Sequence, residues 1–387
     1  MAILQSTTIS GSLDNTGSLA VSGSTIIFPF IESSLTSSFS GSGKMWINAD
    51  TQNLQYSIQT SLGTVQSPAS FMGAWSAGGN IINARRNYAS AGTQNAALVA
   101  GGFISPSAIN TTCTEEYNGS IWSTGGTLIN GRHYSEGTGT QDAALAIGGL
   151  SPSQRAQTEE YNGTSWASGG NLINARSGMG TGGFQNSAVV AGGWNPTATT
   201  VTEEYNGSSW SAGGALPSSR YNMSSGGTQN ALLTFLGTQN GTPSMLNVSQ
   251  QYDGTSWSDT NSLSCARYVA AGSGTTNAAL AFGGANPTDT NNTEEYNGVS
   301  WVTSCSMTTA RSQGDNNNVG SQTSALAISG FIGPASTAVT EEYTKNFISP
   351  YTTNVWTKGA AVITARGEAA GTGTQNAGLF FGGVTPK

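Results

Sequence analysis

The chain has 387 residues, of which 53 are Gly and only 9% are charged. Its 13 Lys and Arg against 20 Asp and Glu give a net charge of −7 without a basic tract, which argues against a nucleic-acid partner. A single His argues against multi-His metal sites and His-based catalysis, and nine Trp, 12 Tyr and 12 Phe in a weakly charged chain favour a fold over disorder.

Cysteines and terminal signals give further exclusions. Three Cys cannot all pair and no CxxC is present, so neither a disulfide scaffold nor a zinc site is expected, and we expect no metal and no cofactor. The start, MAILQSTTIS, lacks the basic and apolar regions of a secretion signal, and no stretch approaches the ~20 apolar residues of a membrane span. We therefore expect assembly in a cytoplasm and no membrane insertion.

Residues 1–65 are rich in Ser, Thr and Gly and lack the repeat that follows them. The segment KMWINADTQNLQYSIQ alternates apolar and polar residues around a polar turn, which predicts a β-hairpin. We expect a small β-rich domain here that serves attachment or oligomerisation.

A repeat of about 44–47 residues, with one longer unit, occupies the rest of the chain. Its marker is a segment such as EEYNGSSW, and ten residues after each marker Trp comes an Arg. In six units a Gly, most often the second of a Gly-Gly pair, follows 17 residues later. The Trp are Trp75, Trp122, Trp166, Trp210, Trp257, Trp301 and Trp356, and the Arg are Arg85, Arg132, Arg176, Arg220, Arg267, Arg311 and Arg366.

Each unit predicts four strands. In one unit, ARSGMGTGG is a strand of small residues, SAVVAGG is apolar, TVTEEYN is a third strand, and Asn-Gly turns the chain into a fourth that begins at Trp. This pattern predicts a propeller blade of four antiparallel strands. The Gly-rich strand suits the innermost position, where large side chains would crowd the axis.

Seven Arg units predict seven blades. The last unit, from Arg366, contains only two strands, so the strands around 66–77 are expected to complete it and close the ring. The expected fold is all-β: a small β-rich domain over 1–65, then a seven-bladed β-propeller over 66–387.

The Gly-Gly, Tyr and Trp of the units resemble kelch-type repeats of galactose-oxidase-like propellers, over about residues 66–387. The usual YDPxTxxW of that family is EEYNGxxW here, which is also similar to the end of the sialidase Asp-box. More specifically, tandem TEEYNGTSW with LxxAR and GTQNAAL is similar to structural proteins of marine tailed phages, cyanophages among them. The resemblance implies a structural or tail protein of a virion.

Charges gather at two repeat positions. Ten of the 20 acids lie in five Glu-Glu pairs, and we interpret these with the repeat Arg as a ring of structural ion pairs. Repetition favours a structural device, whereas a ligand site breaks repeat symmetry; the alternative is an Arg ring that binds an anion. The first Glu of each pair are Glu115, Glu159, Glu203, Glu294 and Glu341, and Gln250-Gln251 takes their place in one unit.

The segment from Gly-Gly to the Glu pair varies between units, while the other spacings are nearly fixed. Because diverse loops on a fixed frame present binding surfaces, we expect a ligand at this face. The candidate residues are Phe103, Trp194, Asn195, Asn240, Asn286 and Phe331. The insertion TKNFISPYTTNV carries Phe347 and Tyr351, which we expect to contact a partner protein.

Enzyme motifs fail on inspection. GMGTGG at 178–183 matches dinucleotide-loop spacing but lies on a small-residue strand and opens no helix. The copper site of galactose oxidase needs two His, and this chain has only His133. We therefore expect no enzyme and assign no catalytic residue.

The interpretation favoured is a bacteriophage virion structural protein, as tail fibre, appendage or capsid decoration, that binds a host-surface glycan or protein receptor. Its expected partners are other virion proteins, through residues 1–65, and copies of itself, with a trimer as one arrangement. The alternatives are a sialidase-like propeller enzyme acting on glycans and a bacterial surface adhesion module.

Overall fold

The computed structural model describes residues 70–348, except 106, 241–244 and 313–318, together with the backbone of six short strands outside that range. Side chains are described for 73–345 with the same gaps. The chain divides into two units, Met72–Asn346 and a second made of Met1–Phe71 with Phe347–Lys387. Within the described residues, no helix is long and apolar enough to cross a membrane.

Six four-stranded sheets, here called blades 1–6, make up the described part of the larger unit. Blades 1 and 2 contain β6 (Ala89–Thr93), β7 (Ala96–Ala100), β10 (Thr114–Tyr117) and β11 (Trp122–Thr124), then β12 (Glu136–Gly139), β13 (Ala144–Ile147), β14 (Thr158–Tyr161) and β15 (Trp166–Ser168). Blades 3 and 4 contain β16 (Gly180–Phe184), β17 (Ser187–Ala191), β18 (Thr202–Tyr205) and β19 (Trp210–Ala212), then β20 (Ser224–Thr228), β21 (Ala231–Phe235), β22 (Ser249–Tyr252) and β23 (Trp257–Thr260). Blades 5 and 6 contain β24 (Ala271–Thr275), β25 (Ala278–Phe282), β26 (Thr293–Tyr296) and β27 (Trp301–Ser304), then β28 (Gly320–Ser321), β29 (Ser324–Ile328), β32 (Thr340–Ile348) and β5 (Ser70–Ala77).

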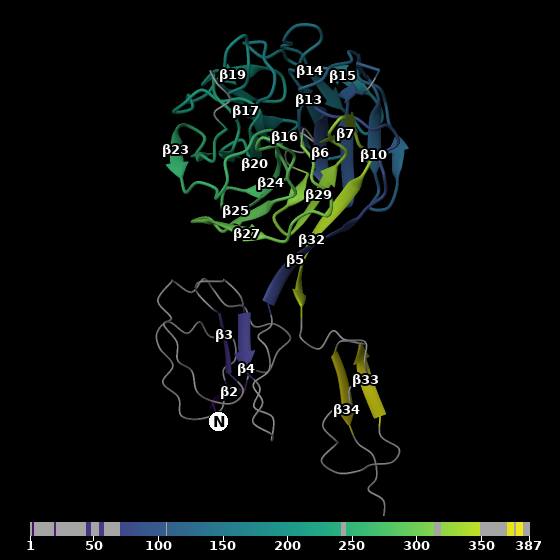
Figure 1. Ribbon diagram of the computed structural model, residues 1–387, viewed down its shortest axis with the longest axis vertical. Coiled ribbons are helices and arrows are strands. Elements are labelled where there is room, and N and C mark those ends of the chain that lie inside the picture. The colour runs from purple at the N-terminus through teal and green to yellow at the C-terminus, as the bar shows by residue number, and fades with distance from the viewer. Residues whose placement is uncertain are drawn as a thin grey trace, which may run out of the picture. The chain divides into compact units, whose positions relative to one another are not determined.

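The first strands of successive blades lie against one another around a common axis (Figure 1). Contacts run from β6 through β12, β16, β20 and β24 to β28, and β28 contacts β6 again. The chain forms a six-bladed β-propeller.

The prediction of seven blades is wrong, because β5 closes a different blade from the one expected. It pairs with β32, so Trp75 completes the blade entered from Arg311. The Trp75 and Tyr343 ring centroids are 5.1 Å apart, close to the 4.9 and 5.0 Å of the Trp and Tyr rings in blades 1 and 4. The strands after Arg366, β33 (Ala370–Thr374) and β34 (Ala377–Phe381), form a separate two-stranded sheet.

Shorter elements complete the described chain. β3 (Lys44–Ile47) and β4 (Leu54–Ser57) pair antiparallel, which is the hairpin predicted from their alternating pattern, and β1 (Ala2–Ile3) pairs parallel with β2 (Leu19–Ala20). Two small hairpins follow the second strands of blades 1 and 6: β8 (Phe103–Ile104) with β9 (Ile109–Asn110), and β30 (Phe331–Ile332) with β31 (Ala335–Ser336).

Glycine occupies positions that close packing and tight turns require. A Cβ on Gly137 of β12 would lie 2.3 Å from the backbone N and O of Ser90 on blade 1, so only Gly allows these strands to approach. In the turn between β10 and β11, Gly119 has a φ of 88°, and Asn118 Oδ1 accepts the N–H groups of Ser120 and Ile121 at 3.0 Å.

The core lies between blades. Successive residues of each second strand point to opposite neighbours, so Val99 packs with Leu326 and Ile328 of blade 6, while Leu98 packs with Ala146 and other side chains of blade 2. Apolar contacts therefore hold the ring together at every junction between blades. The connections at its ends are not part of these contacts and can differ in sequence from blade to blade.

Candidate binding face

One end of the propeller carries the connections between second and third strands and those between blades, because antiparallel strands place the tight turns at the opposite end. In each blade, the residue after the repeat Arg forms an antiparallel bridge with the residue after the Gly-Gly position. We call the surface formed by these six pairs the axial face, since the pairs adjoin the innermost strands. The pairs are Arg86–Phe103, His133–Leu150, Ser177–Trp194, Tyr221–Thr238, Tyr268–Ala285 and Ser312–Phe331.

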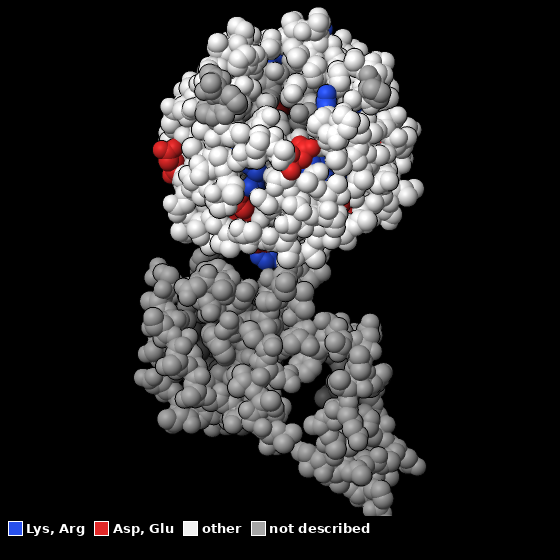
Figure 2. All heavy atoms as spheres, viewed as in Figure 1, with Lys and Arg blue, Asp and Glu red and all other residues white. Residues whose placement is uncertain are grey.

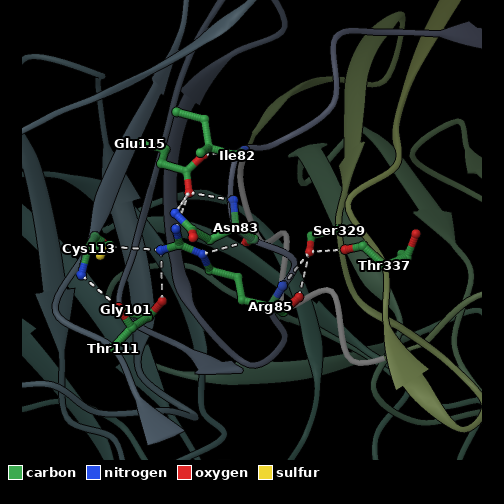
Figure 3. Close-up of polar contacts among 9 residues, drawn as sticks. All are labelled: Ile82, Asn83, Arg85, Gly101, Thr111, Cys113, Glu115, Ser329 and Thr337. Atoms are coloured by element: carbon green, nitrogen blue, oxygen red, sulfur yellow. Dashed lines mark hydrogen bonds and ion pairs between the residues drawn. The ribbon is translucent and has the colours of Figure 1, made fainter. Parts of the chain in front are cut away.

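A buried ion pair supports this position in five of the six blades, as Figure 3 shows for blade 1. The Arg85 guanidinium pairs with Glu115, and both side chains have no exposed surface. Arg85 also donates to the backbone oxygen of Cys113 at 2.7 Å, and Glu115 accepts the N–H groups of Ile82 and Asn83 at 2.6 and 3.1 Å. The pair therefore fixes the incoming connection to the third strand of the same blade.

Four other blades repeat the arrangement. The remaining ion pairs join Arg132 to Glu159, Arg176 to Glu203, Arg267 to Glu294 and Arg311 to Glu341. Burial lowers the pKa of Arg85, Arg132, Arg176 and Arg311, and the charge of each paired Glu opposes that shift. Since each of these carboxylates is buried against its Arg, they are structural groups of the frame.

In blade 4, Gln250 takes the place of the Glu that pairs with the repeat Arg in the other blades. Arg220 donates to Gln250 Oε1 at 2.7 Å and to Thr234 Oγ1 at 2.8 Å, and Gln250 Nε2 donates to Asp259 Oδ1 at 2.7 Å. Burial lowers the pKa of Arg220 to about 10, and the charge of Asp259 opposes the shift. The carboxylate that compensates the Arg220 charge is therefore that of Asp259 on β23, the fourth strand of the blade, and Gln250 connects the two side chains.

The second Glu of each pair joins neighbouring blades. Tyr161 donates its hydroxyl to Glu116 of blade 1, and Tyr205 donates to Glu160 of blade 2, both at 2.5 Å. Tyr117, Tyr252 and Tyr343 make the same contact with Glu342, Glu204 and Glu295. The two adjacent Glu therefore have separate roles, one within a blade and one between blades.

A second set of hydrogen bonds between blades was not recognised from the sequence. Gln141 Nε2 donates to the backbone oxygens of Ala97 and Tyr117 on the preceding blade, at 2.9 and 2.8 Å. The equivalent residues Gln94, Gln185, Gln229 and Gln322 do the same. The repeated Gln of the first hairpin was the signal for this contact.

The innermost backbone adds a ring of hydrogen bonds around the axis. The N–H of Tyr134 donates to the oxygen of Asn87, Gly178 to Tyr134, and Asn222 to Gly178, at 2.8–3.2 Å. These residues all have positive φ, between 52° and 62°. The GMGTGG segment thus begins with a residue of this ring, and a Cβ on Gly178 would lie 2.5 Å from Asn222 Oδ1.

On this rigid frame, the axial face varies from blade to blade. The Trp194 and Tyr221 rings, from neighbouring blades, lie 4.8 Å apart, and both side chains are half-buried. Such rings offer flat apolar faces with polar edges, which suits stacking on a ligand.

A second cluster joins blades 6, 1 and 2. The Arg86 guanidinium lies 5.1 Å from the Phe103 ring centroid and 4.7 Å from that of Phe331. The His133 ring lies 5.4 Å from Phe103 and 5.1 Å from Tyr134. Burial lowers the pKa of His133, and the charge of Arg86 lowers it further.

The predicted ligand residues thus fall into two groups. Phe103, Trp194 and Phe331 are members of the axial face. Asn195, Asn240 and Asn286 are exposed on the connections beside it; Asn240 Oδ1 accepts the Ala198 N–H at 2.8 Å, and Asn286 Nδ2 donates to the Ala266 oxygen at 2.6 Å. Arg86, His133 and Tyr221 were not predicted as members of the site.

Three predicted residues are not placed. Tyr351 and Arg366 lie outside the described residues, and Phe347 lies in β32 without a described side chain. Within the described residues, no group of three or more His, Cys, Asp or Glu is arranged to hold a metal ion. In the view of Figure 2, the described surface is mostly uncharged, with a few isolated charged side chains.

Comparison with known proteins supports the fold. No protein-family model and no curated protein matches the sequence. The chain is similar to a solved structure titled "Structure of YjhT", with a TM-score of 0.56 and 12% identity over 68% of this chain and 96% of that one. At this identity the likeness shows a shared β-propeller fold.

Proposed function

We propose that this chain is a structural protein of a tailed-phage particle whose propeller binds carbohydrate on the host surface through the axial face. The proposal unites the phage-like repeat sequence with a face that differs from blade to blade. It assigns recognition to the propeller and attachment to residues 1–65.

The observation that supports this proposal most strongly is the set of six bridged pairs. Their frame is repeated through buried Arg–Glu or Arg–Gln contacts, yet the pairs differ in residue type around the ring. Variation confined to one surface of a fixed scaffold is typical of binding sites. Half-buried aromatic side chains at five of the pairs, with His133 at the sixth, suit the apolar faces of sugar rings.

A non-enzymatic role fits the carboxylates. Glu115 and Glu203 each hold an Arg in a buried pair, and Glu116 and Glu160 each accept a Tyr hydroxyl. These acids are engaged in structure. Many copies on one particle would make weak individual sites effective through avidity.

The test is retention of host cells and binding to a glycan array by the purified chain, with Trp194→Ala as the variant. Phe184→Ala is the matched control, because Phe184 is an exposed aromatic at the first hairpin of blade 3, at the opposite end of the propeller. We expect the Trp194 variant to lose binding and the Phe184 variant to retain it. Equal binding by both variants, or turnover of a bound glycan, would overturn the proposal.

A further inference from the structure

The cluster at the junction of blades 6, 1 and 2 breaks the repeat symmetry of the ring. Seven of the nine Arg occupy the repeat position, and Arg86 is one of two that do not, while His133 is the single His of the chain. Both follow a repeat Arg directly, on adjacent blades. Symmetry-breaking charge at one junction is unnecessary for the frame, since the other junctions form without it.

Arg86 is held by aromatic rings rather than by an acid. Its guanidinium lies over Phe103 and Phe331, and it takes part in none of the ion pairs among the described residues. Ring faces fix the plane of a guanidinium while leaving its edge N–H donors for other partners. A planar fork of donors fits a carboxylate or sulfate in two-point contact.

The bridged pairs around Arg86 bring no opposing charge. The twelve residues of the six pairs include Arg86 and His133 and contain no Asp or Glu, although the chain as a whole carries a net charge of −7. Asp289 of the blade 5 connection accepts the Gly333 N–H on the neighbouring connection of blade 6 at 3.3 Å. Arg86 therefore carries the positive charge of the axial face at this junction, on a protein whose net charge is negative, and His133, whose pKa burial and Arg86 lower, offers a neutral N–H donor.

We propose that Arg86 and His133, with Phe103 and Phe331, form a subsite for the acidic group of a charged saccharide. This inference rests on the proposed function and names the ligand class: a sugar that carries a carboxylate or a sulfate. Arg86 contacts the anion, His133 contributes a second donor, and the two Phe rings position Arg86.

The first test measures binding to three polymers: dextran sulfate, polygalacturonate and neutral dextran. We expect Arg86→Gln to weaken binding to the preferred acidic polymer about tenfold or more, because a bidentate charged contact is lost. Arg155→Gln is the matched control, since Arg155 is the other Arg outside the repeat position and its loss changes net charge equally. Arg155 lies on the blade 2 connection at the same end of the propeller, where its charge acts on Arg132, but no ring contact positions it among the described residues, so its loss should weaken binding by a much smaller factor than Arg86→Gln does. Sulfate and carboxylate are distinguished by which polymer binds.

The second test needs no variant. The imidazole NMR signals of the wild-type chain come from His133 alone. Titration with the acidic polymer that binds should shift these signals and raise the pKa of His133, and neutral dextran should do neither. Equal affinity of wild type and Arg86→Gln, or unmoved His133 signals at saturation, would overturn the acidic subsite. If instead no glycan and no host cell is retained by the wild type, the proposed function itself fails.

Discussion

The hydroxyl of Tyr205 donates a 2.5 Å hydrogen bond to Glu160 of the preceding blade. Beside Glu160, Glu159 pairs with Arg132 inside its own blade. One dipeptide therefore builds a blade and joins it to the next, which explains why the Glu pairs repeat with the Tyr and the Arg.

Replacing Arg176 with Ala should destabilise the propeller by about 3–5 kcal/mol, the usual cost of leaving one partner of a buried pair alone. Glu203 would remain buried, with only the N–H groups of Ile173 and Asn174 as partners. Chemical denaturation measures the loss, and Arg155→Ala serves as a control outside the repeat position. Unchanged stability in Arg176→Ala would show that the Arg ring is not structural.

Replacing Gln251 with Glu should stabilise the junction of blades 4 and 5. Tyr296 donates to Gly298 O at 3.1 Å, whereas its counterparts donate to a Glu of the preceding blade, a position that Gln251 holds here. We expect a gain of about 0.5–1.5 kcal/mol, typical of one hydrogen bond. In the Tyr296→Phe background the gain should vanish, and a gain that persists there would assign it to another cause.

Replacing Ser249 with Thr should stabilise the same junction. Trp166, Trp210 and Trp257 donate their indole N–H to a Thr of the preceding blade, but the Trp301 Nε1 and the Ser249 Oγ at the equivalent positions are buried without partners among the described residues. The Thr methyl restricts the hydroxyl to fewer rotamers, so a bond worth about 1 kcal/mol is expected. Thermal unfolding followed by Trp fluorescence measures it; Ser249→Ala, which cannot form the bond, should show no gain.

Alkaline pH should destabilise the propeller by ionising the Tyr hydroxyls that donate to Glu side chains of the preceding blade. Burial, with the Glu116 contact, raises the pKa of Tyr161 to about 12, and burial with Glu204 raises that of Tyr252 to about 12. A pKa raised in the folded state means that the folded chain binds protons more tightly, so its stability is full below the ordinary Tyr pKa of 10 and falls as pH rises from about 10 to about 12. Denaturation at stepped pH checks this, and Tyr161→Phe should reduce the slope. A slope unchanged in Tyr161→Phe would contradict the assignment.

Sequence reasoning predicted the strands of a blade well, because Gly-rich, apolar and EEY segments each carry a local pattern that one strand position requires. The predicted number of blades was wrong, because ring closure depends on which later strand the first strand of the propeller pairs with. Tyr343 lacks the Asn-Gly or Asp-Gly turn that follows Tyr296 and its equivalents, and this difference marks the blade whose last strand comes from Ser70–Ala77.

The candidate site was predicted in part. Phe103, Trp194 and Phe331 were found because they follow the Gly-Gly position, where units visibly differ. Arg86 and His133 were not included, because they adjoin the repeat Arg and their bridges to that position exist only once the strands are paired. Variation at the residue after the Arg was the available signal.

The closing strand also determines how the propeller responds to force. The Gly78 N–H bonds to the Thr340 oxygen, and Trp75 lies against Tyr343, so β5 runs antiparallel to β32 with Ser70 opposite Ile348. Ser70 and Ile348, the outer ends of these two strands, therefore lie at the same end of one sheet. Tension applied between them would break the hydrogen bonds of this pair one after another, from that end inward, whereas pulling across the ring would load many bonds together. Blade 6 would thus open first under a load applied through these two strands.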